Sequence, residues 1–216
     1  MNDLDLRQRV IDELEFEPSV DAANIGVAAE NGIITLTGHV ASYAEKFAAE
    51  RVAQRVKGVR GIAQEIEVRT PVGKKKADDE IAAQAVNIIT WDTTIPNEVV
   101  KVKVQSGWIT LTGKVDWQFQ KVAAEQAVRK LSGVVGVTNL IEIEARVRAS
   151  DVKSRIENAL KRSAEIEAGG IRVHVVSDSK VVLDGRVHSW HERDAAERAA
   201  WSVQGVTEVD DHLAIG

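Results

Sequence analysis

The chain has 216 residues, of which 44% are hydrophobic and 28% are charged, and its formal net charge is −5. This composition is typical of a folded soluble protein and excludes a disordered chain, while the acidic balance argues against a general nucleic-acid binder, which needs clustered Lys and Arg. The sequence contains no cysteine, so disulfides and thiolate metal sites are excluded.

No segment approaches the roughly 18 uninterrupted apolar residues of a membrane-spanning helix. The first residues, Met1 to Arg7, lack the basic and then apolar regions of a secretory signal. The sequence as given therefore predicts a cytoplasmic location.

The first predicted element is an amphipathic helix. Its apolar residues recur at helical spacing and would share one face: Leu6, Val10, Ile11 and Leu14. Two short alternating runs follow, and Asn31-Gly32 predicts the turn between them, because Asn and Gly tolerate the positive φ of a two-residue turn. We therefore expect a β-hairpin after the first helix.

A second helix and a last strand follow the hairpin. Ser42 and Glu45 form a capping box, in which the hydroxyl and the carboxylate accept hydrogen bonds from free amide groups at the helix start. Gly58 lies where a helix would end in a left-handed residue, and the alternation over residues 62–69 predicts the closing strand. This order predicts an α+β module, in which two helices cover one face of a three-stranded mixed sheet.

The same pattern occurs three times. Ten-residue hairpin segments echo one another at Asn31–Val40, Ser106–Val115 and Asp178–Val187. Two sets of glycines share this register: Gly38, Gly113 and Gly185, and Gly58, Gly133 and Gly205. We therefore expect the same elements in each copy, including a two-residue turn in the hairpin, and we interpret the first set of glycines as structural. A second capping box is predicted at Ser189 and Glu192.

The repeats predict three domains, residues 1–72, 73–147 and 148–216, with short linkers at 71–77 and 146–150. Units of about 70 residues bury little core alone, so we expect some packing between neighbours. The linker segment Lys74-Lys75-Lys76 is interpreted as solvated, because polybasic membrane anchors use about 4–8 cations. Attraction to anionic lipid is the alternative.

Three short segments carry a family resemblance: Leu36–Val40, Leu111–Val115 and Leu183–Val187, each followed by an Ala-rich helix and a Gly-Val step. The chain resembles the BON domain family, named for bacterial osmotically inducible protein Y and nodulation proteins, three times over nearly its whole length. The resemblance implies non-catalytic modules that bind phospholipid surfaces or other partners, often in envelope or osmotic stress. It also makes the periplasm the alternative location. The third copy departs from the pattern at Asp184 and Glu208, which replace Thr and Gly.

Aromatic residues supply the candidate interface. Trp190 and Trp201 are 11 residues apart, which places them within about 20° of one another around a helix. At the position of Trp201 the other copies carry Gln54 and Arg129, which we expect to face solvent. An apolar pair on a polar stripe predicts an interface, with the neighbouring repeat or alternatively with an external ligand or membrane.

Trp117 and Phe119 lie at the start of the corresponding helix in the second copy. We expect them to pack within the protein, and insertion into a lipid interface is the alternative.

Other patterns do not support a catalytic or metal site. The GxxG segments 58–61 and 133–136 resemble RNA-clamping loops, but the third copy lacks the motif, so we interpret them as structural. His188 and His191 have one-turn spacing without a third ligand nearby, and we expect neither a metal nor a cofactor. Common catalytic motifs are missing from the sequence, so we expect no enzymatic activity.

Taken with the family resemblance, the sequence predicts a non-enzymatic adaptor that binds phospholipid surfaces or a protein partner, does not bind nucleic acid, and gains avidity from its repeats. Two alternatives remain open. One is a protein that senses a small ligand or a potassium ion under osmotic stress, and the other is a structural protein that self-assembles through its aromatic faces.

Overall fold

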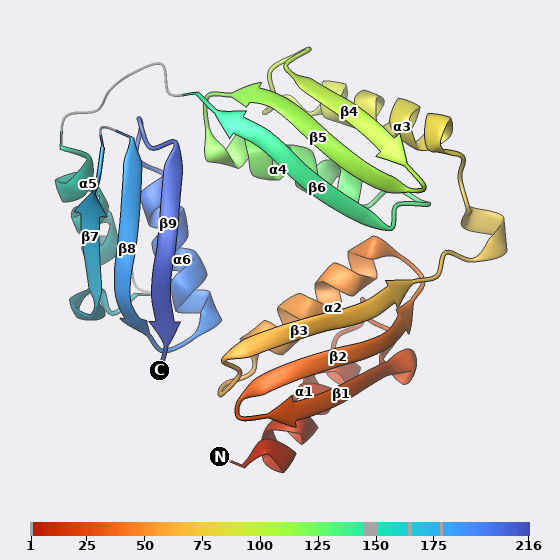
Figure 1. Ribbon diagram of the computed structural model, residues 1–216, viewed down its shortest axis with the longest axis horizontal. Helices are drawn as coiled ribbons and strands as arrows, with labels where there is room; N and C mark the ends of the chain where they lie inside the picture. Colours follow the sequence, from red (N-terminus) through yellow and green to blue (C-terminus); the bar gives the residue numbers. More distant parts are fainter. Residues whose placement is uncertain (1, 145–150, 164–165, 178) are drawn as a thin grey trace. The chain divides into compact units, whose positions relative to one another are not determined.

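The computed structural model describes residues 2–144, 151–163, 166–177 and 179–216. It contains three α+β modules, each with a three-stranded sheet, in the strand orders β1-β2-β3, β4-β5-β6 and β7-β8-β9 (Figure 1). The predicted fold class is confirmed. Residues 146–150, the predicted second linker, lie outside the described residues.

The three modules contain the same elements in the same order. The first has α1 (Asp3–Phe16), β1 (Ile25–Glu30), β2 (Ile33–Val40), α2 (Tyr43–Arg55) and β3 (Gly61–Val68). The second has α3 (Asp78–Trp91), β4 (Val100–Gln105), β5 (Trp108–Val115), α4 (Gln118–Arg129) and β6 (Gly136–Ile143). The third has α5 (Val152–Arg162), β7 (Ile171–Val175), β8 (Lys180–Val187), α6 (Trp190–Trp201) and β9 (Glu208–Ile215).

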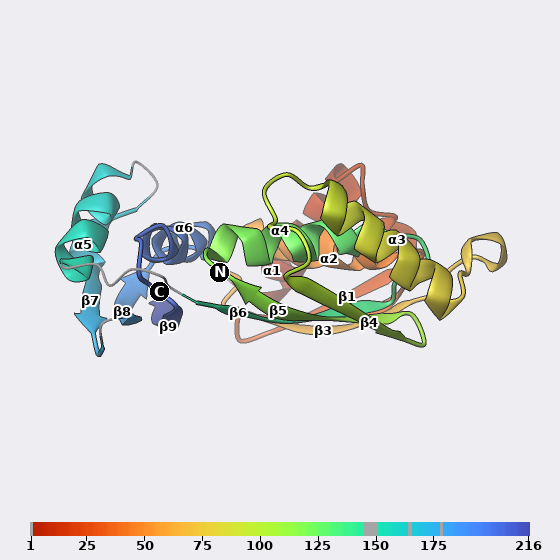
Figure 2. The same ribbon diagram turned by 90° about the horizontal axis from the view of Figure 1, so that it is seen from above.

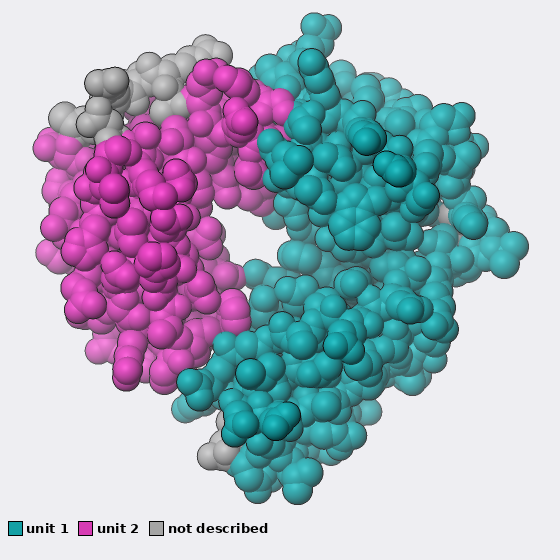
Figure 3. All heavy atoms as spheres, viewed as in Figure 1, with its two compact units in different colours: residues 1–112, 123–140 teal, residues 113–122, 141–216 magenta. Residues whose placement is uncertain are grey.

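The backbone contacts divide the chain into two compact units. One unit comprises residues 1–112 and 123–140, and the other comprises residues 113–122 and 141–216 (Figure 3). The division passes through the second module, since both units contain parts of β5, α4 and β6.

Each sheet is mixed. In the first module β1 pairs antiparallel with β2, and β2 pairs parallel with β3, with Ile33 opposite Gly61. The third module repeats this arrangement, with Lys180 opposite Glu208. Figure 2 shows α3 and α4 on the same side of β4, β5 and β6. The predicted layering of two helices on one sheet face is therefore present.

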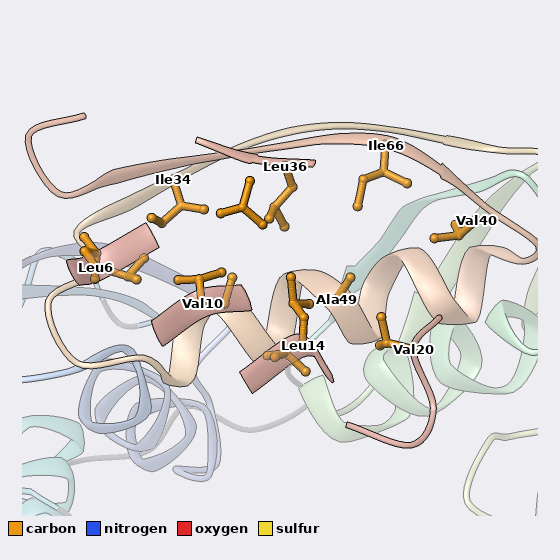
Figure 4. Packing of buried hydrophobic residues seen from close by; sticks show 13 residues of the cluster. Leu6, Val10, Leu14, Val20, Ile34, Leu36, Val40, Ala49 and Ile66 are labelled. Atoms are coloured by element: carbon orange, nitrogen blue, oxygen red, sulfur yellow. The ribbon is translucent and has the colours of Figure 1, made fainter. Parts of the chain in front are cut away.

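The core of the first module lies between its sheet and its two helices. Its members come from α1, β2, α2 and β3: Leu6, Val10, Leu14, Ile34, Leu36, Ala49 and Ile66 (Figure 4). Burying each large aliphatic side chain stabilises the fold by about 1.5–3 kcal/mol. Along β2, buried side chains that face the helices alternate with exposed or half-buried side chains on the opposite face of the sheet.

Two of the repeated glycines allow close backbone approach. Gly38 has a φ of 106°, and a Cβ atom there would lie 2.0 Å from the carbonyl oxygen of Asn24. Gly185 has a φ of 136°, and its Cβ would lie 2.0 Å from the carbonyl oxygen of Gly170. Their predicted structural role is confirmed, because no other residue fits this conformation and this space.

The first two hairpins turn as predicted. Asn31 and Gly32 have φ of 51° and 79°, and the equivalent Ser106 and Gly107 have φ of 52° and 77°. Both turns therefore use two left-handed residues.

The third hairpin differs, and the expectation of a two-residue turn is wrong there. β7 ends at Val175 and β8 begins at Lys180, and the N–H of Val176 donates to the carbonyl of Lys180 at 3.0 Å. Ile171 pairs with Gly185, whereas in the first module Ile25 pairs with Gly38, so the third hairpin is one residue longer. Segment 176–179 contains no glycine for the second left-handed position, so it cannot easily form the tight turn.

An acidic residue at the start of the first helix supports each of the first two turns. The Asp3 carboxylate accepts hydrogen bonds from the N–H groups of Asn31 and Gly32, at 2.9 and 3.2 Å. The Asp78 carboxylate accepts from Ser106 and Gly107 at 2.7 and 2.8 Å. These carboxylates join the helix start to the hairpin.

The serine part of each predicted capping box is confirmed, whereas the carboxylates accept from N–H groups that lie before the first helical turn. The hydroxyl groups of Ser42 and Ser189 accept hydrogen bonds from the N–H groups of Glu45 and Glu192, each at 3.2 Å. The later helix ends are only partly as predicted. Gly58, Gly133 and Gly205 have positive φ, but the helices before them end three or four residues earlier.

The capping carboxylates also join two distant segments. Glu192 accepts hydrogen bonds from the N–H groups of His188 and Glu167, both at 2.6 Å. Glu45 likewise accepts from Ala41 at 3.0 Å and from Asp21 at 2.9 Å. In each case one carboxylate connects the start of the second helix to the loop after the first helix.

The second module has an amide instead of a carboxylate at this position, and the amide accepts at the helix start. Gln120 uses one oxygen to accept from the N–H groups of Asp116 and Trp117, both at 3.1 Å. The residue equivalent to Asp21 is Pro96, which has no N–H to donate. A single acceptor oxygen is therefore sufficient in this module.

Candidate interaction surfaces

The predicted pair Trp190 and Trp201 lies at the two ends of α6, and both side chains are half-buried. Trp201 packs against the third module's core, and its Nε1 donates to Glu197 Oε1 at 3.1 Å. The guanidinium carbon of Arg193 lies 5.3 Å from the centre of the Trp190 ring, and Arg193 Nε donates to Asp211 Oδ2 at 2.6 Å. Their role as an interface stays a prediction.

Arg129, at the position equivalent to Trp201, does not face solvent, so that expectation is wrong. Its side chain is 13% exposed and pairs with Glu125 at 2.6 Å. Its guanidinium carbon lies 3.4 Å from the centre of the Phe47 ring. The planar cation stacks on an aromatic face while its stem is buried, which is a favourable arrangement for arginine.

Tyr43 lies at the start of α2, which also carries Phe47. Burial raises the pKa of the Tyr43 hydroxyl, and the nearby Arg129 acts in the opposite direction. The hydroxyl therefore stays protonated at neutral pH. Within the unit that contains both residues, contact with Arg129 makes part of α2 a packed surface rather than a free one.

The structure brings Trp117 and Phe119 together before and within the first turn of α4. Their ring centres are 6.4 Å apart, with 33° between the ring planes. Phe119 is 55% exposed, whereas Trp117 is half-buried. The aromatic pair predicted from the sequence thus forms a contact, and its part in an interface stays a prediction.

The most exposed aromatic side chains were not selected from the sequence. Phe16 and Trp91 are 82% and 84% exposed, at equivalent positions that end the first helix of the first and second modules. Trp108, the first residue of β5, is 49% exposed. An alignment of the repeats pairs Phe16 with Trp91. It does not predict that both side chains are exposed, because both positions border apolar helix faces.

The helix α3 differs from the other first helices by its lack of charge. The eleven residues from Ile81 to Trp91 include no Asp, Glu, Lys or Arg. One face packs inward through Ile81, Ala85 and Ile89, whereas Val86 is 50% exposed and Trp91 is 84% exposed. This charge-free run was readable in the sequence and is the signal that would have identified the surface.

Two of the three acidic residues in the first turn of α3 have local partners. Asp78 accepts the two hydrogen bonds of the hairpin turn. Glu80 pairs with Lys76 at 3.3 Å. The exposed surface of α3 beyond its first turn is therefore uncharged and partly apolar.

The GxxG segments and the histidines singled out from the sequence do not form a ligand site in the described residues. A Cβ atom at Gly136 would lie 2.4 Å from the Trp108 ring, so this glycine of the GxxG segment makes room for the indole. His188 Nδ1 lies 3.2 Å from Glu192 Oε2. Within residues 2–144, 151–163, 166–177 and 179–216, no cluster of three or more His, Asp or Glu is arranged to hold a metal ion. No helix in these ranges is long and apolar enough to cross a membrane.

Comparison with known proteins assigns the three repeats to a family. A family model described as the BON domain matches residues 2–70, 77–145 and 148–216. The chain belongs to the BON domain family. The predicted resemblance is confirmed for all three copies.

Among curated relatives, this BON protein is 29% identical over 147 residues to osmotically-inducible protein Y of Escherichia coli strain K12, covering 64% of this chain and 71% of the relative. Among solved structures, it matches CdsD, a structural protein of the type III secretion system of Chlamydia trachomatis, with 13% identity and a TM-score of 0.27. That match covers 98% of this chain and 92% of CdsD. A match to the C-terminal domain of CdsD has 12% identity and the same TM-score, 0.27, and covers 100% of both chains.

Proposed function

We propose that this protein is a non-enzymatic BON protein that binds phospholipid surfaces through α3 of its second module. The observation that carries the proposal is the charge-free run from Ile81 to Trp91, which ends in an indole that is 84% exposed. Its relation to osmotically-inducible protein Y supports a role linked to osmotic stress.

A membrane interface suits this helix for two reasons. Placing α3 at the boundary between headgroups and acyl chains removes few charges from water, because its exposed face carries none beyond the first turn. An indole is favoured at that boundary, since its ring is apolar and its N–H can remain hydrated. Burying Trp91 and Val86 would supply the apolar contribution to binding.

The sequence before α3 supplies the complementary charge. Three lysines precede the helix in the sequence, at positions 74–76, and a cation near an anionic membrane contributes about 1 kcal/mol. Lys76 also pairs with Glu80 at 3.3 Å. Trp91 lies at the other end of the helix, about 20 Å away for a helix of this length. A helix lying in the plane of the membrane could therefore contact headgroups at one end and insert its indole at the other.

The test uses the full chain and vesicles of phosphatidylglycerol with phosphatidylcholine. We expect the parent protein to cosediment with these vesicles and its fluorescence to shift to shorter wavelength. Trp91→Ala should weaken binding by about tenfold, because it removes the largest exposed apolar side chain of α3.

Phe16→Ala is the matched control, because Phe16 occupies the same position on α1, whose exposed face is charged. This variant should bind vesicles as the parent does. Failure of the parent to bind anionic vesicles, or equal binding by Trp91→Ala, contradicts the proposal and leaves a protein partner as the better explanation.

A further inference from the structure

The sheet of the second module holds an indole flat against its uncovered face. Trp108 Nε1 donates a hydrogen bond to Thr138 Oγ1 at 2.8 Å, across from β5 to β6. A Cβ atom at Gly136 would lie 2.4–2.7 Å from the six-membered part of the ring, so the indole rests on this glycine. One ring face is thus packed on the sheet and the other is open to solvent, since Trp108 is 49% exposed.

In this arrangement the indole can contact a ligand through its exposed ring face. Its only hydrogen-bond donor is already bonded to Thr138, so a ligand meets the π face alone. The hydrogen bond and the glycine also fix the ring orientation before any ligand arrives. A fixed aromatic surface costs little entropy on binding and suits a ligand with a flat face.

Cationic, hydroxyl and apolar groups lie on the same sheet face as the indole, and β6 also exposes one carboxylate there, Glu142. On β4, Lys101 and Lys103 are exposed and alternate with half-buried valines. On β5 and β6 the outward positions carry Thr110, Thr112 and Leu140, the last of which is 57% exposed. Within the described ranges, neither lysine forms an ion pair.

The first module lacks this combination, although its fold is the same. At the positions equivalent to Trp108, Lys103 and Lys101 it carries Ile33, Ala28 and Gly26. Because the hairpin and sheet form there without these residues, the fold does not require them. Folding alone therefore does not account for these residues in the second module.

We propose that this face, defined by Trp108, Thr110, Thr112, Lys101 and Lys103, binds an acidic oligosaccharide. A sugar ring presents a flat array of C–H groups that can stack on the open indole face. Its hydroxyl groups can exchange hydrogen bonds with the threonines, which both donate and accept. Its carboxylates complement the two lysines on β4.

The same groups fit the competing ligands less well. Single-stranded nucleic acid also stacks on aromatic rings, but it needs a cationic groove that follows its backbone, whereas the exposed cations of β4 are two lysines on one short strand. Protein interfaces are depleted of lysine, and here two exposed lysines lie on the same sheet face as the indole.

The test is calorimetric titration of the full chain with a polygalacturonate oligomer at low and high salt. We expect saturable binding that weakens with salt, because screening reduces the attraction between lysines and carboxylates. Trp108→Ala should weaken binding by about tenfold or more. The double variant Lys101→Gln with Lys103→Gln should weaken it similarly and remove most of the salt dependence.

Two further variants separate binding from folding and from the lipid proposal. Thr138→Val keeps the indole but removes its hydrogen bond, so it should weaken binding by several-fold without unfolding the module. Trp91→Ala should bind the oligomer as the parent does, because α3 lies on the opposite face of the sheet. Loss of vesicle binding in that variant is thus distinguishable from loss of oligosaccharide binding.

Three results would overturn the assignment. The first is no saturable binding of polygalacturonate at millimolar concentration. The second is equal binding of a neutral cello-oligosaccharide by the parent, or of polygalacturonate by Trp108→Ala. The third is tighter binding of an oligothymidylate that depends on Trp108, which would make the face a nucleic-acid platform.

Discussion

Replacing Glu192 with glutamine tests whether this carboxylate joins two parts of the third module. The side chain is 7% exposed and accepts from the N–H groups of Glu167 and His188, both at 2.6 Å, with one oxygen for each. Glutamine offers one acceptor oxygen and turns an NH2 group toward the second donor. One charge-assisted bond is then lost and one N–H is left unsatisfied.

We expect a loss of about 2 kcal/mol in the free energy of unfolding, since hydrogen bonds to charged groups contribute about 1.5–3 kcal/mol. For a module of this size the melting temperature should fall by about 10 °C. Thermal unfolding of the full chain measures this effect. Hydrogen exchange adds a local readout, because the amide protons of Glu167 and His188 should lose part of their protection.

The effect should also depend on pH. Burial of the carboxyl group opposes its ionisation, but hydrogen bonds from the N–H groups of His188 and Glu167 and from the His188 ring outweigh burial and hold the pKa of Glu192 below its usual 4.5. The carboxylate therefore stabilises the module above that value, and this contribution is lost as the pH falls through the lowered pKa. The difference between Glu192→Gln and the parent should shrink accordingly. A variant that melts within about 1 °C of the parent at neutral pH, with both amides still protected, would refute the reasoning.

Two further changes test the backbone constraints of the fold. Gly38→Ala should destabilise the first module by more than about 2 kcal/mol in thermal unfolding, because its Cβ would collide with the Asn24 carbonyl. The control Gly73→Ala should leave the melting temperature unchanged, because a Cβ atom there has nothing within 4 Å. Equal effects of the two changes would argue against the collision. Asp78→Ala should cost about 1 kcal/mol and speed amide exchange at Ser106 and Gly107, whose N–H groups it accepts, and Asp79→Ala serves as the control. Unchanged exchange at the turn would contradict that role.

The sequence predicted the modules well because their markers are local. Asn31-Gly32 and the Ser42–Glu45 capping box act within a few residues, so their patterns determine a turn and a helix start without knowledge of the rest of the fold. The third hairpin shows the limit of this approach. One added residue after Val175 changes the turn, while the downstream register of glycines remains intact.

The candidate surfaces were harder to predict because exposure depends on packing between distant segments. Arg129 looks like a surface residue in a helical pattern, yet it is buried against Phe47, more than 80 residues away. Trp91 looks like the end of an apolar helix face, yet it extends into solvent. The orientation of Trp108 depends on a hydrogen bond to Thr138. Thr138 lies on β6, which is separated from β5 by the whole of α4, so the contact cannot be read from the local sequence.

Pro96 and Gln120 occur together in the second copy, and this combination limits how the repeats can exchange segments. Because Asp21 and Glu167 each offer an N–H that Pro96 lacks, the loop and the helix start of one copy are matched to each other. A crossover between copies that falls between these segments would combine a proline loop with a glutamate, or a donor loop with a glutamine. Recombination among the three copies is therefore expected to preserve this block of about 25 residues as a single inherited unit.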